Sequence, residues 1–322
     1  MNILRRSLHW FMDATGLDKN VDEGAVNGWM EKRRHALAGV LDDAAGNDAI
    51  GERIRDGRPF AAGKIGDVEM KCLCWHLRIR NLYKYTFVPP TFGELELREQ
   101  AGVFPATEEV YHRFCDLLLE RLADLDLAAV WFNPGEAGVL NRHAPAAVRT
   151  SLRSLEPYFF PQKPWSAALA GKKVLVIHPF AESIVRQYRQ RQAIWATAPD
   201  VLPGFDLVTI KAPLGFSVNP FADWFGMLHF LEEQMELLAA KDGFDVALVG
   251  CGAAGIPLAV HSKRLGKIGI HSGGPTQLLF GIRGGRWDNR PEFQSLFNDH
   301  WIRPRPDETP EEAATVDHGG YW

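Results

Sequence analysis

Two acidic residues at the end of an apolar stretch are the first candidates for chemistry. In "GKIGDVEM", Asp67 and Glu69 are separated by one residue. In extended backbone two such side chains point the same way, whereas on a helix they diverge by about 200°. Converging carboxylates repel one another, and a Mg²⁺ or Mn²⁺ ion held by them and by substrate phosphates would relieve that repulsion. The alternative is that Asp67 caps a helix and Glu69 lies in its first turn.

A glycine-rich loop later in the chain is the second candidate. Gly250-x-Gly252-x-x-Gly255 directly follows an apolar segment and opens a predicted helix, where backbone N–H groups bind phosphate. An NAD(P)-binding loop would be followed by an acid about 20 residues on. That place holds Ile270, His271 and Ser272 instead. The loop therefore predicts phosphate binding, with NAD(P) binding or a purely structural turn as alternatives.

Further polar residues follow other predicted strands. Residues 271–287 form a second glycine-rich turn that carries Arg283 and Arg286, and arginine binds phosphate through two hydrogen bonds. The alternative is that both arginines are solvated surface residues. Glu136 and His178 each follow a predicted strand, so each is a candidate general base or a structural polar residue.

The elements that must position these residues alternate regularly. Apolar segments predict strands, and helical spacing of apolar residues predicts the helices between them. This alternation predicts a doubly wound, mostly parallel Rossmann-like sheet with helices on both faces. In such sheets ligands bind at the carboxyl ends of the strands, where all the candidates fall. The predicted strands are 60–66, 127–133, 172–180, 205–213, 245–252 and 267–274, and the helices include 29–41, 48–55, 107–123, 182–195, 222–240 and 257–265.

The chain divides into three predicted parts. Residues 1–47 form an N-terminal helical segment, 48–300 the α/β domain, and 301–322 a tail that ends on aromatic residues and folds back or remains separate. Residues 157–166 are rich in proline and aromatics and read as a connection between two halves. Residues 1–16 predict an amphipathic helix that either docks on the domain or makes peripheral membrane contact.

Composition excludes several classes of protein. The net charge of −4 and pI near 6.3 over 322 residues, without basic runs, argue against nucleic-acid binding. Four scattered cysteines are too few for a disulfide framework and fit a reducing compartment. No apolar run reaches the roughly 20 residues that span a bilayer. We therefore expect a cytoplasmic protein, with the inner face of the membrane as a possible location if residues 1–16 bind there.

These motifs resemble a known family. "GKIGDVEM" resembles the R-[FI]-G-D-G-E-[LM] segment of the GT-D-fold glycosyltransferases, whose signature is D-x-E, and "DVALVGCGAAGIPLAVHSKRLGKIGIHSGG" resembles their late strand–glycine loop–helix–strand. The segments "GKKVLVIHPFAESI" and "GGPTQLLFGIRGGRW" resemble proteins encoded in bacterial surface-polysaccharide gene sets. The resemblance covers roughly residues 50–290. Lys64 replaces the usual arginine, and Val68 the usual glycine.

The resemblance implies a GT-D-like sugar transferase that uses a nucleotide-diphosphate sugar and a glycan or lipid-linked acceptor. Asp67 and Glu69 would engage the metal and the diphosphate. Glu136 is the first candidate for the base and His178 the second. Other hypotheses are an NAD(P)-dependent oxidoreductase and a non-catalytic nucleotide-sugar-binding protein. The residues expected to bind the donor are Lys64, Gly250, Gly252, Gly255, His271, Arg283 and Arg286.

Overall fold

The structure is a computed structural model that describes residues 37, 39–79, 90–217, 220–316 and 319–322. The chain divides into two compact units, Met1–Ala38 and Gly39–Trp322. Nearly all of the first unit lies outside the described residues. The helix predicted at 1–16, and nearly all of that predicted at 29–41, fall there.

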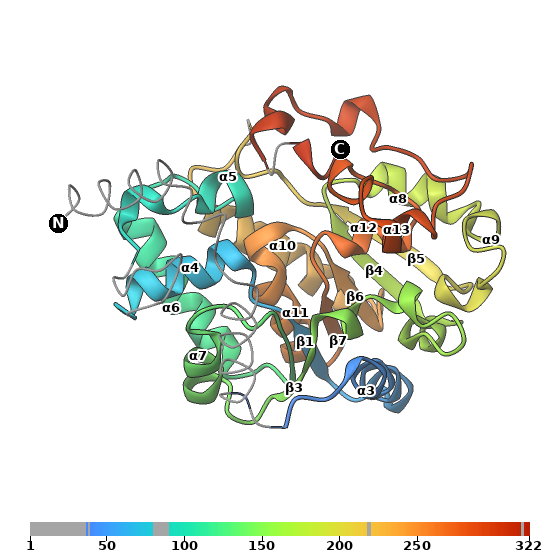
Figure 1. The fold of residues 1–322 in the computed structure, drawn as a ribbon, viewed down its shortest axis with the longest axis horizontal. Helices are drawn as coiled ribbons and strands as arrows, with labels where there is room; N and C mark the ends of the chain where they lie inside the picture. Colours follow the sequence, from blue (N-terminus) through green and yellow to red (C-terminus); the bar gives the residue numbers. More distant parts are fainter. Residues whose placement is uncertain (1–36, 38, 80–89, 218–219, 317–318) are drawn as a thin grey trace, which may run out of the picture. The chain divides into compact units, whose positions relative to one another are not determined.

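A single sheet of seven parallel strands forms the centre of Gly39–Trp322 (Figure 1). Its strand order is β3-β2-β1-β7-β6-β4-β5, and every pair of neighbours is parallel. The doubly wound α/β fold predicted from the sequence is thus confirmed. The strands are β1 (Phe60–Gly63), β2 (Leu127–Val130), β3 (Val148–Ser151), β4 (Lys173–His178), β5 (Asp206–Lys211), β6 (Val246–Val249) and β7 (Ile268–His271).

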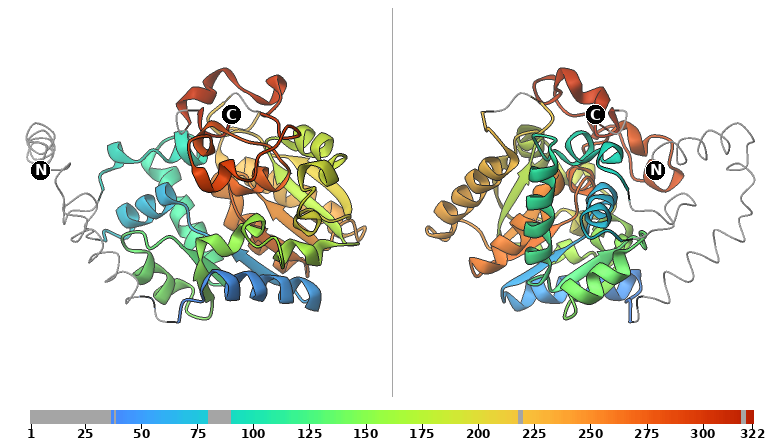
Figure 2. Two further views of the ribbon diagram at one scale, coloured as in Figure 1. Left: turned by 45° about the vertical axis from the view of Figure 1, so that its right-hand side comes forward. Right: turned by 90° about the vertical axis from the view of Figure 1, so that its left-hand side faces the viewer.

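Helices lie around this sheet, as the two further views show (Figure 2). They are α3 (Asp43–Asp56), α4 (Asp67–His76), α5 (Leu97–Ala101), α6 (Glu108–Leu122), α7 (Glu136–His143), α8 (Ala181–Tyr188), α9 (Arg191–Ile194), α10 (Trp224–Ala239), α11 (Gly255–Arg264), α12 (Pro275–Leu279) and α13 (Pro291–Gln294). Thr107 is the N-cap of α6 as predicted, because its side chain accepts a hydrogen bond from the N–H of Val110.

The connections create one reversal in the middle of the sheet. The chain leaves β4 for β5 at the edge, whereas it leaves β6 for β7 in the opposite direction. Since β4 and β6 are neighbours, their carboxyl ends flank a topological switch point, where open α/β sheets form a crevice for ligands.

Alternate residues of the inner strands β1, β2, β4, β6 and β7 build the two apolar layers. One face packs against α3, α8 and α9 in a core that includes Ile50, Ile184 and Ile194, together with Phe60, Ala62, Leu127, Ala129, Val174, Val176, Val246, Leu248, Ile268 and Ile270 from the strands. The other face is covered by α11, which contacts β1, β6 and β7 and also packs against α6 and α10. Full burial of each large aliphatic side chain contributes roughly 1.5–3 kcal/mol.

Two local predictions differ from the structure. The helix predicted at 182–195 is divided into α8 and α9, and the break turns Trp195 into the core, where its Nε1 donates to the carbonyl of Leu279. The edge strand β3 was not predicted, because in Val148–Ser151 only Thr150 is buried and no apolar periodicity marks it.

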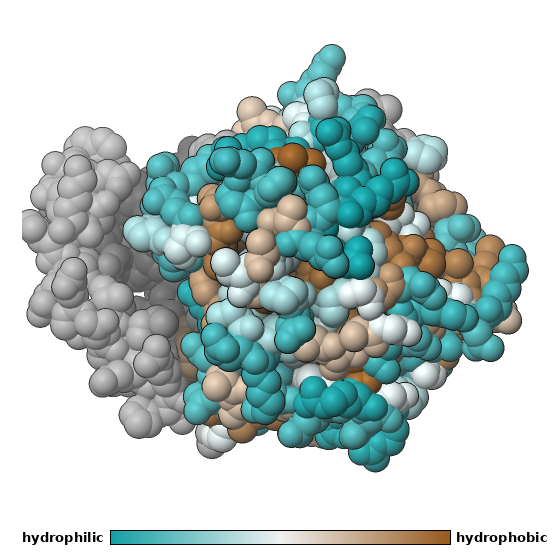
Figure 3. Space-filling model, turned by 90° about the vertical axis from the view of Figure 1, so that its right-hand side faces the viewer, coloured by the Kyte–Doolittle hydropathy of each residue, from teal (hydrophilic) through white to brown (hydrophobic). Residues whose placement is uncertain are grey.

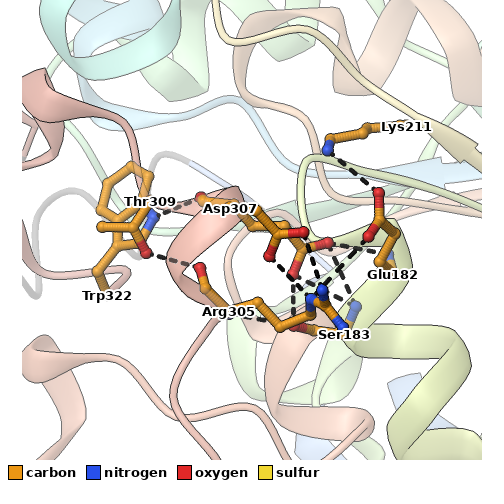
Figure 4. A network of polar contacts seen from close by, with 8 residues as sticks. Glu182, Ser183, Lys211, Arg305, Asp307, Thr309 and Trp322 are labelled. Carbon is orange, nitrogen blue, oxygen red and sulfur yellow. Dashed lines mark hydrogen bonds and ion pairs between the residues drawn. The ribbon is translucent and has the colours of Figure 1, made fainter.

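The last residues of the chain lie on the side of the sheet where α8 and α12 begin (Figure 1). Glu308 is buried and accepts hydrogen bonds from the backbone N–H groups of Glu182 and Ser183 and from the Ser183 hydroxyl. Trp322 donates from Nε1 to the carbonyl of Glu308, within the polar network of Figure 4. The described residues of the tail, 301–316 and 319–322, therefore fold back on the domain and are anchored at the start of α8.

Within the described residues, no helix has both the length and the apolar character required to cross a bilayer. The face in Figure 3 is mainly hydrophilic, with separate hydrophobic areas between the hydrophilic residues. Large hydrophobic side chains that are exposed include Val148, Phe230 and Leu237, which lie on different parts of β3 and α10.

Candidate functional site

A cavity of about 500 Å³ lies at the carboxyl ends of the strands. This volume falls in the range of about 300–1,000 Å³ that is usual for small-molecule sites. Most of its wall is formed by the ends of the strands and the segments just after them. These are Lys64 and Gly66–Glu69 after β1, Trp131 after β2, His178–Phe180 at the end of β4, Pro213–Phe216 after β5, Gly250–Gly252 after β6 and His271–Pro275 at the end of β7.

The acidic pair does not lie on extended backbone, so that part of the interpretation was wrong. Helix α4 begins at Asp67, and its N-cap is Gly66, whose backbone is extended. Strand β1 ends at Gly63, whereas the two side chains would point the same way only if extended backbone continued through Glu69. Instead they occupy the first turn of α4, where negative charge is favourable. Both nevertheless line the cavity, and Glu69 is 8% exposed.

Lys64 lies beside this pair and carries positive charge into the cavity wall. Its Nζ is 4.9 Å from the centre of the Trp131 ring. Burial lowers the pKa of Lys64, while the charges of Glu69, Asp67 and Glu136 oppose that shift. The carboxylates and the ammonium group thus stabilise one another at the end of β1.

The carboxylates at the end of β1 decide what kind of divalent cation this site can bind. Within the described part of the chain, no group of three or more His, Cys, Asp or Glu side chains is placed to hold a metal ion. Mg²⁺, however, typically binds one or two carboxylates and completes its shell with waters and substrate phosphates. Because Asp67 and Glu69 lie two residues apart on helix α4, their side chains diverge and do not form a joint site for one cation. Either carboxylate alone fits a cation that arrives with a phosphate ligand and its waters.

Glu136 is completely buried and does not line the cavity. Its carboxylate accepts hydrogen bonds from the N–H groups of Trp131 and Asn133, at 3.1 and 3.0 Å. Burial raises the pKa of Glu136 to about 7, against the opposing effect of these hydrogen bonds. The carboxyl group therefore holds the loop that carries Trp131, including Phe132 with its left-handed φ of 59°. This geometry makes Glu136 a positioning residue for the wall on which Lys64 packs.

Two histidine rings line the cavity from neighbouring parts of the sheet. His178 accepts a hydrogen bond at Nδ1 from the N–H of Phe180, and His271 Nδ1 lies 3.0 Å from the carbonyl oxygen of Val249. Burial lowers the pKa of His178 to about 3. Burial, and then the charge of Lys64, lower the pKa of His271 to about 3 as well.

The predicted glycine loop forms the cavity wall between these rings. Gly252 has a φ of 57°, and a Cβ there would lie 2.5 Å from the carbonyl oxygen of Ala101. Gly255 begins α11 and does not line the cavity. It packs under His271 instead, since a Cβ at position 255 would stand 2.0 Å from two atoms of that ring.

The two predicted arginines separate in space. Arg286 lines the cavity, and its guanidinium lies 4.9 Å from the centre of the Tyr321 ring. Arg283 does not line it and packs over the Phe297 ring at 5.7 Å. The cavity thus brings together most of the predicted set, namely Lys64, Asp67, Glu69, His178, Gly250, Gly252, His271 and Arg286.

Aromatic residues form a wall that the sequence did not predict. Trp322 packs edge-on against Phe180 and Phe216, with ring centres 5.7 and 6.1 Å apart, and all three line the cavity. They come from the loops after β4 and β5 and from the end of the tail. The aromatic ending "HGGYW" was the only signal for the third of them.

Glu156 is a further cavity residue that the sequence did not reveal. It lies between two short 3-10 helices, Leu152–Leu155 and Pro157–Phe159, just before the segment 157–166, which the sequence predicts only as a connection. Burial raises the pKa of Glu156 to about 7, and the Tyr158 hydroxyl donates to its carboxylate at 3.1 Å. Arg153 lies 3.4 Å from the same carboxylate.

The fold and the cavity together define a doubly wound α/β protein with a charged and aromatic site at the carboxyl edge of its sheet. Comparison with protein-family models, with curated proteins and with solved structures gave no match.

Proposed function

We propose that this protein is a glycosyltransferase that moves a sugar from a nucleotide-diphosphate sugar to a glycan or lipid-linked acceptor in bacterial surface-polysaccharide synthesis. The observation that carries the proposal is that the D-x-E segment and the late glycine loop, which the resemblance pairs, line one cavity with Lys64 and Arg286. These segments are about 180 residues apart in the chain, and each was selected from sequence for phosphate binding.

The diphosphate would bind where positive charge and backbone N–H groups meet. Lys64 and Arg286 supply the positive charge, and the Gly250–Gly252 segment supplies close backbone approach. These groups would stabilise the negative charge that grows on the diphosphate as the glycosidic C–O bond breaks. A divalent cation bound with the diphosphate at Asp67 or Glu69 would add Lewis-acid stabilisation of the same charge.

The remaining wall suits the organic parts of the ligands. Aromatic faces at Phe180, Phe216 and Trp322 present apolar area next to the polar strand ends. Bases and sugar rings both pack on such faces, so this wall supports a ligand larger than a phosphate group. The fixed loop that Glu136 holds would exclude water from the Lys64 side of the site.

A panel of nucleotide sugars tests the proposal, with binding measured by thermal shift with and without Mn²⁺ and transfer or slow hydrolysis measured by release of nucleoside diphosphate. We expect one nucleotide sugar to stabilise the protein and to be consumed. Asp67→Asn and Glu69→Gln should abolish turnover without unfolding the protein, whereas Glu52→Gln, on the exposed side of α3, should leave it unchanged.

The same panel separates the other hypotheses. Stabilisation by NAD(P) and by none of the nucleotide sugars would indicate an oxidoreductase and would contradict the proposal. Binding of a nucleotide sugar with neither hydrolysis nor transfer to any acceptor would indicate a binding protein. Full turnover by either carboxylate variant at saturating donor and metal would exclude Asp67 and Glu69 from the reaction.

A further inference from the structure

The rings of His178 and His271 reach the cavity from opposite faces of the sheet. His271 is in register with Val249, and Val249 with Ile177, so these three side chains share one face. His178 follows Ile177 and, because strand side chains alternate, belongs to the other face, that of Val174 and Val176. The carboxyl end of β6 lies between the two strands that carry the rings, and the ring of His178 packs on Gly250, where a Cβ would stand 2.6 Å from its Cδ2.

The backbone partner of each ring fixes which nitrogen carries the proton. The N–H of Phe180 can only donate, so Nδ1 of His178 holds a lone pair and the neutral ring carries its hydrogen on Nε2. The carbonyl of Val249 can only accept, so Nδ1 of His271 carries the hydrogen and Nε2 holds the lone pair. The two rings therefore have opposite tautomers.

Both histidines line the cavity, and Nε2 is the ring nitrogen that each has left for a ligand. Each ring uses Nδ1 for its backbone contact, and neither Nε2 has a hydrogen-bond partner among the residues that the structure describes. Burial keeps the pKa of both rings at about 3, and Lys64 adds to this effect at His271. Both rings are consequently neutral near pH 7.

We propose that His178 and His271 form a hydrogen-bonding pair of opposite polarity that binds hydroxyl groups of the transferred sugar. Nε2–H of His178 donates to a hydroxyl oxygen, and Nε2 of His271 accepts a hydroxyl hydrogen. This inference rests on the proposed function, because it assigns the sugar part of the proposed donor to this pair.

The lone pair on Nε2 of His271 favours a hydroxyl group over a phosphate group as the ligand. A phosphate diester oxygen has no hydrogen to donate, and its negative charge would face the lone pair of Nε2. A sugar hydroxyl both donates and accepts, so it satisfies either ring. His271 thus leaves the predicted diphosphate-binding set and joins the sugar site. His178 leaves the set of candidate bases, since its cavity-facing nitrogen already carries a hydrogen.

The first test measures the tautomers directly in the full chain. We expect ¹⁵N–¹H NMR of histidine-labelled protein to show Nε2 protonated in His178 and Nδ1 protonated in His271. Both signals should stay unchanged from pH 5 to pH 9. Identical tautomers in the two rings, or reversed ones, would overturn the assignment. His178→Gln and His271→Gln identify the two signals.

The second test uses paired variants. The Asn amide reaches the place of Nδ1, so His178→Asn and His271→Asn keep an atom for the backbone partner and lose the cavity-facing one. The Gln amide reaches the place of Nε2, so the Gln variants keep the ligand contact. For the nucleotide sugar that binds wild-type protein best, we expect each Asn variant to lose about 2- to 10-fold in affinity. The Gln variants should lose less, and the matching nucleoside diphosphate should bind all of them equally.

These outcomes separate the inference from the proposed function. If the wild-type protein binds no nucleotide sugar, that result contradicts both the proposed function and the sugar site. Asn variants that bind the nucleotide sugar as tightly as wild type overturn the inference alone. So does an equal loss of affinity for nucleoside diphosphate, since the rings would then contact the phosphates.

Discussion

The carboxylate of Glu69 lies directly against the backbone of Gly66. A Cβ at position 66 would stand 2.0 Å from Oε2 of Glu69, closer than any real contact. The φ of Gly66 is −69°, which every residue adopts, so glycine is required here for space and not for backbone conformation. Helix α4 begins at the next residue, and the glycine thus lets a residue of its first turn fold back over the N-cap.

We therefore expect Gly66→Ala to displace the Glu69 carboxylate while the protein stays folded. The new methyl group meets only the end of a flexible side chain, so the melting temperature should change little. Affinity for the nucleotide sugar should fall about tenfold, the equivalent of losing one charge-assisted contact. Isothermal calorimetry measures the affinity. Gly93→Ala is the matched control, because a Cβ there meets nothing within 4 Å. Unchanged affinity in Gly66→Ala would separate Glu69 from ligand binding.

Lys64 offers a test of charge at the same end of the cavity. Lys64→Met keeps an unbranched side chain against Trp131 but removes the charge that faces Glu69. We expect the affinity for nucleoside diphosphate to fall at least tenfold, since charged contacts contribute about 1.5–3 kcal/mol. Lys64→Arg should retain most of it, because a guanidinium also stacks on an aromatic ring. Equal binding by the Met and Arg variants would contradict a role for this charge.

The raised pKa of Glu136 predicts how the stability of the protein depends on pH. Its pKa is raised by burial to about 7 in the folded protein, from an ordinary value of 4.5. Between these values the folded state holds a proton that the unfolded state has lost, so the free energy of unfolding decreases as pH rises from about 4.5 to about 7. The decrease is on the order of 3 kcal/mol for this one group.

Glu136→Gln should flatten the pH dependence by that amount, because it removes the ionisable group and keeps an acceptor for the two N–H groups. Urea unfolding at pH 5 and pH 8 measures the difference. The buried carboxyl of Glu156 adds a decrease of the same sign, which the variant retains. Glu136→Ala should lose about 1–3 kcal/mol at both pH values, because the N–H groups of Trp131 and Asn133 are left without acceptors. Equal pH slopes in wild type and Glu136→Gln would refute the assignment.

The anchor of the tail is the fourth test. Glu308→Ala removes the acceptor of the N–H groups of Glu182 and Ser183, and we expect a loss of about 1–3 kcal/mol in stability. Since Trp322 donates to the carbonyl of residue 308 and lines the cavity, nucleotide-sugar affinity should fall with it. Glu311→Ala, an exposed change in the same segment, is the control. Unaltered tryptophan fluorescence and affinity in Glu308→Ala would show that the tail is held by other contacts.

The fold was largely predictable because most of its strands are short, have an apolar centre and are bounded by glycine, proline or charge. Six of the seven strands appear near their predicted positions, and the seventh, β3, has a half-exposed sequence that no periodicity marks. The break between α8 and α9 depends on where Trp195 finds room in the core. That is a tertiary effect which local spacing does not encode.

The site was predictable in position and less so in detail. The rule that ligands bind at strand ends located Lys64, Gly250 and His271 on one edge. The start of α4 was the uncertain point, because a helix that begins at Asp67 or after Glu69 fits the same letters. Residues brought in by tertiary packing, such as Phe216 and Trp322, have no local motif. Burial of Glu136, and with it its pairing to backbone N–H groups, was equally invisible in the sequence.

The pairing of β1 with β7 has a consequence for how the site comes into being. The first strand of the sheet lies in its centre and needs the seventh strand, about 200 residues later, as its neighbour on one side. During synthesis on the ribosome, the edge of β1 that pairs with β7 therefore stays unpaired until residue 271 has emerged. Such a topology is slow to fold and leaves a strand edge exposed meanwhile. The cavity wall, which draws on the ends of both β1 and β7, is accordingly among the last parts of the nascent chain to form.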